Sequence, residues 1–184
     1  MKTVALVGSL RKDSYNMKLV KHIQEKFPEL GIEIADISHL PFFNEEIEAD
    51  PGQTVRDFQA LVKSADAVIV ATPEYNASMP AVLKNAIDWV SREGKEMAGK
   101  KVLIMGASMG ALGTVKAQIH LRDVLDTVGV AAYVMPAAGG NDIFVGAAHT
   151  KFDDNGQLTD GPTAQFISMV VERFKNFAAL EVNL

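Results

Sequence analysis

The feature that most constrains this fold is the alternation of short apolar runs with longer segments of helical periodicity. Five runs are expected to form strands: Val4–Val7, Ile32–Ile37, Ala67–Ala71, Val102–Met105 and Val130–Met135. Five segments place apolar side chains at helical spacing: Asn16–Phe27, Val55–Lys63, Ala81–Val90, Thr114–Val128 and Ala164–Phe177. Strands that alternate with helices need crossover connections, which predict a parallel sheet covered by helices on both faces.

The expected architecture is therefore an α/β fold, a flavodoxin-like doubly wound five-stranded parallel sheet of strand order 2-1-3-4-5. The 184 residues show no composition shift and no linker rich in Pro, Gly and Ser, so residues 1–184 are expected to form a single domain. Ligands of such sheets bind at the carboxyl ends of the strands. This rule predicts that residues 8–16, 72–80 and 106–113 line one crevice.

The first of these loops has the composition of a phosphate site. Gly8 permits a sharp turn, and three short polar side chains and the guanidinium of Arg11 follow it directly before a helix. The free N–H groups at the start of a helix carry about half a positive charge, which favours an anion. A terminal phosphate monoester suits such a loop. The alternative is that Ser9 and Ser14 only cap the helix and that Arg11 is a solvated surface charge.

The second loop is stiffened at both ends, because Pro73 and Pro80 restrict its backbone. A rigid loop that carries an aromatic ring and a carboxamide can hold a flat polar ring system through main-chain groups and Tyr75. The alternative is an ordinary connection in which Glu74 lies in solvent and Tyr75 packs over the following helix.

The third loop contains three glycines, which remove side-chain bulk and permit close approach by a ligand. Their spacing is G-x-x-x-G-x-x-G, which differs from the dinucleotide fingerprint G-x-G-x-x-G. None of the loops has the G-x-x-x-x-G-K-[ST] pattern of a P-loop. A classical Rossmann dehydrogenase and a nucleoside triphosphatase are therefore disfavoured.

Composition excludes several other classes of function. The chain has no Cys, so a redox function must use a bound cofactor rather than thiol chemistry. A formal charge of −5 with scattered Lys and Arg disfavours nucleic acid as a ligand. The four histidines lack metal-ligand spacing, so no metal is expected. The apolar runs are of strand length and no signal-peptide pattern is present, so the expectation is a cytoplasmic protein without a membrane span.

Taken together, the three loops resemble the NAD(P)H-dependent FMN reductases of flavodoxin-like fold, particularly the soluble bacterial quinone and chromate reductases. The resemblance is carried by GSLRKDSYN at residues 8–16, by PEYNASMP at 73–80 with LKNAIDW at 83–89, and by the glycines of 106–113. It reaches about Met135, and these motifs occur in order at the expected strand ends.

The resemblance implies bound FMN, with NADPH or NADH as co-substrate. It implies that the FMN phosphate is held by Ser9, Arg11, Ser14 and Asn16, that the isoalloxazine is lined by Pro73, Glu74, Tyr75 and Asn76, and that its other edge is bordered by Ser108, Gly110 and Gly113. No side chain then acts as a catalytic acid or base, because the flavin N5 carries the hydride.

The reaction that the resemblance implies is a ping-pong, two-electron reduction of quinones, with chromate, azo compounds and FMN as further acceptors. It also implies a homodimer or a homotetramer. Trp89 is expected either in the core or at a subunit interface.

Two alternatives to an enzyme remain open. One is a flavodoxin-like electron carrier that binds FMN, which Arg11 and the modest negative charge disfavour. The other is a flavin-binding interaction module, because hydride donation depends on open space above the ring rather than on a signature residue. The stretch from Pro136 to Pro162 is longer than a compact connection needs, and it is either functional, oligomeric or a mobile loop.

Overall fold

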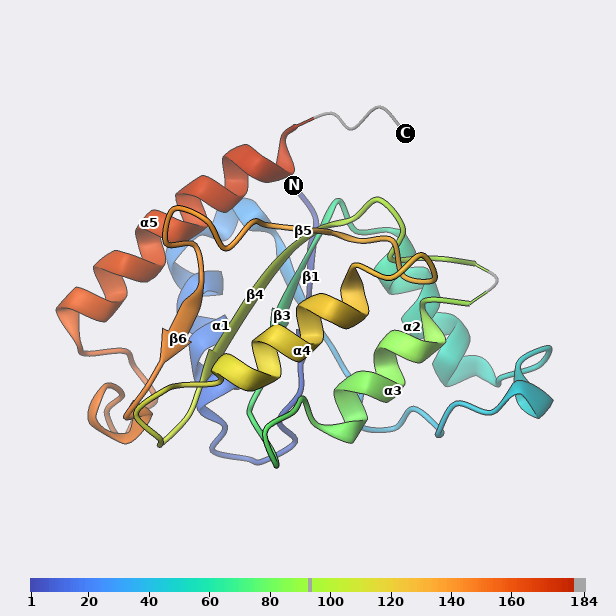
Figure 1. The fold of residues 1–184 in the computed structure, drawn as a ribbon, viewed down its shortest axis with the longest axis horizontal. Coiled ribbons are helices and arrows are strands. Elements are labelled where there is room, and N and C mark those ends of the chain that lie inside the picture. The colour runs from blue at the N-terminus through green and yellow to red at the C-terminus, as the bar shows by residue number, and fades with distance from the viewer. Residues whose placement is uncertain (93, 181–184) are drawn as a thin grey trace.

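The computed structural model describes residues 1–92 and 94–180 and shows a parallel sheet between two layers of helices (Figure 1). The strands are β1 (Thr3–Val7), β2 (Ile32–Ala35), β3 (Ala67–Ala71), β4 (Lys101–Ala107), β5 (Tyr133–Val134) and β6 (Ile143–Val145). The α-helices are α1 (Tyr15–Lys26), α2 (Gln53–Lys63), α3 (Ala81–Trp89), α4 (Val115–Leu125) and α5 (Gly161–Ala178). Short 3₁₀ helices are η1 (Pro28–Leu30), η2 (Glu45–Ile47) and η3 (Ala148–Thr150). The strands run parallel in the order β2-β1-β3-β4-β5, which confirms the predicted topology.

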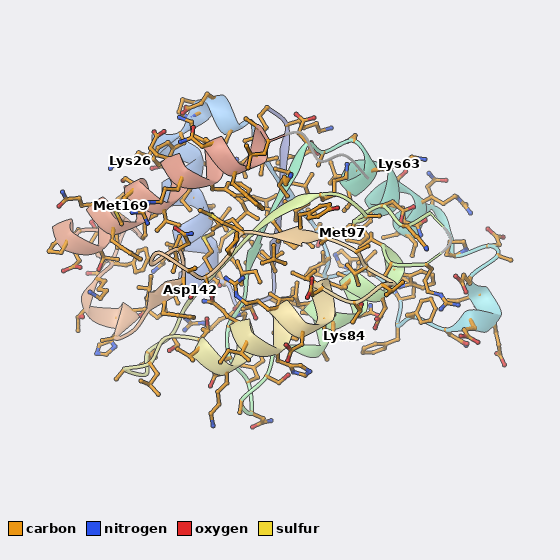
Figure 2. All side chains as sticks on the ribbon, turned by 45° about the horizontal axis from the view of Figure 1, so that its top comes forward. Lys26, Lys63, Lys84, Met97, Asp142 and Met169 are labelled. Carbon is orange, nitrogen blue, oxygen red and sulfur yellow. The ribbon has the colours of Figure 1, made fainter. Side chains whose placement is uncertain are left out.

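Alternate residues of the central strands point to opposite faces of the sheet and form two separate cores. On one face, Val4 and Leu6 pack with apolar residues of α2, α3 and α4. On the other face, Ala5 and Val7 pack with apolar residues of α1 and α5. Both faces are covered, which explains why the strands read as continuous apolar runs. Apolar side chains lie inside and charged ones outside: Met97 is buried, whereas Lys26, Lys63 and Lys84 lie on outer helix surfaces (Figure 2).

The prediction of five strands was wrong in one respect, because two short strands share the fifth position. β5 pairs with Lys101 and Val102 at the start of β4, whereas β6 pairs with Met105 to Ala107 at its end. The expected strand Val130–Met135 is thus reduced to two residues, and Pro136, which has no N–H to donate, follows it closely. The missed strand β6 is only three residues long and gave no period that a sequence pattern could detect.

The long stretch from Pro136 to Pro162 is largely structured. It contains β6, η3 and an antiparallel bridge between Phe152 and Leu158, and it ends at the start of α5.

Trp89 is 1 % exposed and donates from Nε1 to the Pro41 carbonyl at 2.8 Å, so it is a core residue of this chain. Within the described residues, no helix has the length and hydropathy needed to cross a bilayer.

Asp160 begins α5 as its N-cap, and its charge makes this helix start sensitive to acid. Oδ1 accepts hydrogen bonds from the Thr163 N–H at 3.1 Å, from the Thr163 hydroxyl and from Lys151 Nζ at 2.9 Å. These contacts, the Thr163 hydroxyl first, lower the pKa of Asp160 from 3.8 to about 2. A carboxyl whose pKa is lowered on folding stabilises the protein above its unfolded pKa.

We therefore expect an Asp160→Asn variant to be less stable than the wild type near pH 6. This difference should disappear as the pH falls from about 4 to about 2, because the wild-type carboxylate is protonated in that range. Urea unfolding of both proteins across this range measures the difference. Asp123→Asn, which removes an exposed carboxylate in the middle of α4, is the matched control. A stability difference for Asp160→Asn that does not change with pH would contradict this account of the cap.

Candidate functional site

The loops that follow β1, β3 and β4 meet at the carboxyl ends of the strands, at the bottom of Figure 1. A cavity of about 280 Å³ lies between them. It is lined by Ser9, Arg11, Ser14, Tyr15, Asn16, Pro73, Glu74, Tyr75, Ala107, Ser108 and Met109. The structure thus brings together most of the predicted site residues from three distant parts of the sequence.

Gly8 lets the first loop lie directly against the second. A Cβ atom at Gly8 would be 2.9 Å from Pro80 Cγ, 3.2 Å from Pro73 Cδ and 3.3 Å from Leu83 Cβ. Such distances are too short for a side chain, so this position excludes one for lack of space. The Gly8 N–H also donates to the Ala71 carbonyl at 2.9 Å and continues the strand pairing into the loop.

The start of α1 presents a set of hydrogen-bond donors to the cavity. Ser14 is the N-cap, and its Oγ accepts from the Met17 N–H at 3.2 Å, which leaves its own hydroxyl proton free to donate. The N–H groups of Tyr15 and Asn16 lie in the first turn and have no partner within the helix. Arg11 is exposed, with Cζ 5.3 Å from the centre of the Tyr15 ring. These donors make the helix start suitable for an anion.

Asn16 connects the first loop to the end of β4. Its Nδ2 donates to the Ala107 carbonyl at 3.1 Å, and its Oδ1 accepts from the Ala107 N–H at 2.9 Å. The side chain is only 3 % exposed, so both contacts are shielded from water. Asn16 therefore positions two loops with its side chain, and only its backbone N–H is left to contribute at the helix start.

The second loop ends in a tight turn. Tyr75 and Ser78 exchange backbone hydrogen bonds of 2.9 and 3.1 Å, and Asn76 and Ala77 between them have φ values of +51° and +62°. Positive φ at both central residues fits a turn of type I′, in which asparagine is favoured. Tyr75 is 51 % exposed and lines the cavity, whereas Asn76 lies at the tip of the turn, outside the cavity lining.

Glu74 joins the second loop to α4. Its Oε2 accepts from the backbone N–H groups of Lys116 at 2.9 Å and of Ala117 at 3.2 Å. A carboxylate at this place satisfies free N–H groups of the helix and interacts favourably with its dipole. The alternative that Glu74 lies in solvent was therefore wrong.

The third loop approaches the other two through its glycines. A Cβ at Gly106 would be 2.4 Å from the Thr72 carbonyl oxygen, so no side chain fits there. Gly113 has a φ of +65°, a conformation that favours glycine. Among the described residues, a Cβ at Gly110 would meet Ser108 Oγ alone, at 3.6 Å, which leaves the space open. Ser108 lines the cavity, whereas Gly110 and Gly113 are not part of its lining.

No sequence motif marked the segment that holds this third loop in place. The Ser108 N–H donates to the Val145 carbonyl at 2.9 Å, the Ala148 N–H donates to the Ser108 carbonyl at 2.9 Å, and the Ala147 N–H donates to the Gly110 carbonyl at 3.0 Å. β6 and the residues after it thus support the loop after β4. The cavity also includes Met109, 62 % exposed, which no motif singled out.

Metal binding is not suggested by the described part of the chain, in which no group of three His, Asp or Glu side chains is arranged to hold an ion. His120 lies outside the cavity lining, where its Nδ1 is 2.7 Å from Ser78 Oγ. This contact connects α4 to the turn of the second loop.

Comparison with known proteins gives consistent matches over the chain. The family model for NADPH-dependent FMN reductase matches residues 1–141. The chain is 38 % identical over 175 residues to an NAD(P)H-dependent FMN reductase of Pseudomonas aeruginosa, covering 94 % of this chain and 92 % of the relative. It is 38 % identical over 179 residues to a quinone reductase of Pseudomonas putida, covering 95 % of this chain and 93 % of the relative.

A solved structure with a similar fold is FerB, a flavoenzyme NAD(P)H:(acceptor) oxidoreductase from Paracoccus denitrificans. The TM-score is 0.86 at 32 % sequence identity, and the match covers 96 % of each chain. The sequence and the fold therefore agree along nearly the whole length.

The link between Asn16 and Ala107 predicts a specific loss of stability. Asn16→Ala would leave the buried N–H and carbonyl of Ala107 without partners, at a cost of about 2–4 kcal/mol in the free energy of unfolding. Asn176→Ala, on the exposed side of α5, is the control and should change that free energy by less than about 0.5 kcal/mol. Urea unfolding measures both. Equal, small effects of the two substitutions would show that the link does not stabilise the loops.

Proposed function

The chain belongs to the NADPH-dependent FMN reductase family, and from this premise we propose that the cavity between the three loops is its FMN site. Membership makes the protein an oxidoreductase with FMN as cofactor and NAD(P)H as co-substrate. The observation that carries the proposal is the convergence of a helix start, a stiff proline-bounded loop and a glycine loop on one cavity. We further propose that residues 1–184 form a single FMN-binding domain.

At one end of the cavity, Ser9, Ser14 and Arg11 would hold the FMN phosphate. Ser14 retains a hydroxyl donor, and the backbone N–H groups of Tyr15 and Asn16 add the positive end of α1. A phosphate dianion needs several donors at once, and this end of the cavity supplies them from side chains and backbone together. The residues present therefore fit the charge of the phosphate.

The isoalloxazine would lie between the second and third loops. Pro73, Glu74, Tyr75 and Asn76 would line it, chiefly through backbone groups, and Ser108, Gly110 and Gly113 would border its other edge. The open space beside Gly110 favours close approach of a ligand. The side chains of Glu74 and Ser108 would act by positioning the two loops. Glu74 accepts from the start of α4, and Ser108 donates to the Gly113 carbonyl at 2.7 Å.

When bound, FMN supplies the redox chemistry by taking a hydride from NAD(P)H and passing two electrons to an acceptor. The protein contributes position, electrostatics and shielding from water, and we assign no side chain as catalytic acid or base. We propose quinones as acceptors in a ping-pong cycle, with chromate and azo compounds as further acceptors. The quinone reductase named among the relatives supports the first choice.

We also propose that the protein is a cytoplasmic homodimer or homotetramer. Apolar side chains are exposed near the cavity, with Leu10 at 59 %, Met109 at 62 % and Leu112 at 75 %. A second copy that covered them would remove this apolar surface from water. The cytoplasm is proposed because NAD(P)H, the co-substrate, is a reductant found there.

Replacement of Arg11 tests the phosphate end of the site. Arg11→Ala should raise the Kd for FMN by about 10- to 100-fold, because a charge-assisted contact to phosphate contributes about 1.5–3 kcal/mol. Arg56→Ala, in α2 and paired with Asp50, is the control and should leave the Kd unchanged. Quenching of flavin fluorescence measures both. An unchanged Kd for Arg11→Ala would reject its role in phosphate binding.

Initial rates with NADH and a benzoquinone test the proposed cycle. If NAD(P)+, formed by hydride donation from NAD(P)H, leaves before the quinone binds, double-reciprocal plots at several fixed quinone concentrations are parallel lines. Intersecting lines would show that both substrates bind together and would overturn the ping-pong cycle. Bound flavin with no quinone-dependent oxidation of NADH would favour the electron carrier instead.

A further inference from the structure

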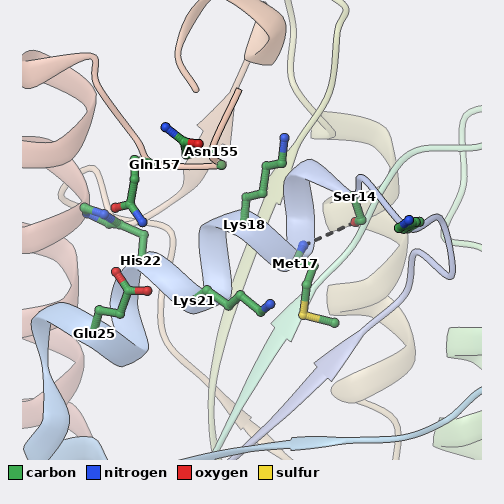
Figure 3. Close-up of a pocket in the computed structure, with 10 residues that line it drawn as sticks. Ser14, Met17, Lys18, Lys21, His22, Glu25, Asn155 and Gln157 are labelled. Carbon is green, nitrogen blue, oxygen red and sulfur yellow. Dashed lines mark hydrogen bonds between the residues drawn. The ribbon is translucent and has the colours of Figure 1, made fainter. Parts of the chain in front are cut away.

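A second cavity, of about 260 Å³, lies along the side of α1, between that helix and the turn at residues 155–157 (Figure 3). We call it the α1 groove. It is lined by Lys12, Ser14, Met17, Lys18, Lys21, His22, Glu25, Asn155, Gly156 and Gln157. From Ser14 to Glu25 the lining follows one face of the helix over about 16 Å, at 1.5 Å per residue.

The α1 groove concentrates positive charge in a chain whose formal net charge is −5. Lys12, Lys18 and Lys21 line it, and among the described residues none of the three forms an ion pair. Lys18 Nζ lies 5.2 Å from the centre of the Tyr15 ring, and its stem packs beside Gly156. Cations that are not neutralised by the protein attract an anionic ligand.

Glu25 is the acidic residue that lines the groove together with the lysines. Glu25 lies at the far end of the groove from Ser14. Asp153, in the facing turn, uses Oδ1 to accept from the Gln157 N–H at 2.8 Å. Asp13 and Asp154 are exposed, and none of these three aspartates lines the groove.

The opposite wall and the far end offer neutral polar groups. The amides of Asn155 and Gln157 line the groove from the turn. Burial and the nearby Lys26 lower the pKa of His22, which favours the neutral ring, and its Nε2 has no hydrogen-bond partner among the described residues. Cations near Ser14 and neutral hydrogen-bonding groups farther along match a phosphate followed by a nucleoside.

Ser14 lines both the α1 groove and the cavity between the three loops. A ligand extended beyond a phosphate at Ser14 therefore meets the lysines of the groove next. We propose that the α1 groove binds the ADP half of FAD, so that the protein takes FAD as well as FMN in the same flavin site. This inference rests on the proposed function, because it requires the flavin phosphate to lie at Ser14.

Comparison of FMN with FAD binding to the 184-residue protein, freed of flavin, tests the inference. Fluorescence quenching gives the Kd for each flavin in the wild type and in a Lys18→Gln/Lys21→Gln double variant. The double variant should bind FAD about tenfold more weakly and FMN within about twofold of the wild type, because only the second phosphate and the nucleoside reach the groove. Lys63→Gln, which removes an exposed lysine of α2 outside the groove lining, is the control and should change neither Kd.

The outcomes separate this inference from the proposed function. FMN binding without FAD binding in the wild type would overturn the α1 groove as a nucleotide site and leave the FMN site intact. Equal effects of the double variant on both flavins, or no effect on either, would also overturn it. Failure of the wild type to bind either flavin would contradict the proposed function itself.

Discussion

The candidate site depends on the pairing of the Asn16 side chain with both backbone groups of Ala107. Apart from this pairing, the sheet and side-chain packing connect the start of α1 to the end of β4. With the pairing, the donors around Ser14 and the glycine loop after β4 are held at a fixed separation in a place that water barely reaches. Glu74 adds a second link, from the loop after β3 to the start of α4. These two links fix the positions of the loops and so define the shape of the cavity between them.

Strand pairing and core packing place the loops so that these links can form. β1, β3 and β4 are paired in register over five residues each, so their carboxyl ends meet at one edge. Gly8 and Gly106 then let the loops approach at distances where a methyl group would overlap with Pro80 and Thr72. Two apolar cores, one on each face of the sheet, hold the strands rigid beneath the site. Rigid strands position the polar groups of the loops, which is how such folds commonly form ligand sites.

The sequence predicted the sheet order because apolar runs and helical periods are local signals that a crossover rule turns into topology. It also predicted which loops converge, since those loops follow strands expected at the centre of the sheet. It did not predict that Asn16 binds Ala107 or that Glu74 caps α4, because both contacts join residues more than 40 positions apart. The strand β6 was missed because three residues are too few to show a period, although they support the loop at Ser108.

An anaerobic titration of the FMN-loaded protein with NADPH tests whether the cavity between the three loops holds a flavin that NAD(P)H reduces. We expect loss of the oxidised-flavin absorbance at one equivalent of NADPH, and its recovery when a quinone is added. Absorbance that persists with excess NADPH and with excess NADH would contradict it, because the bound flavin would then need another protein as its reductant.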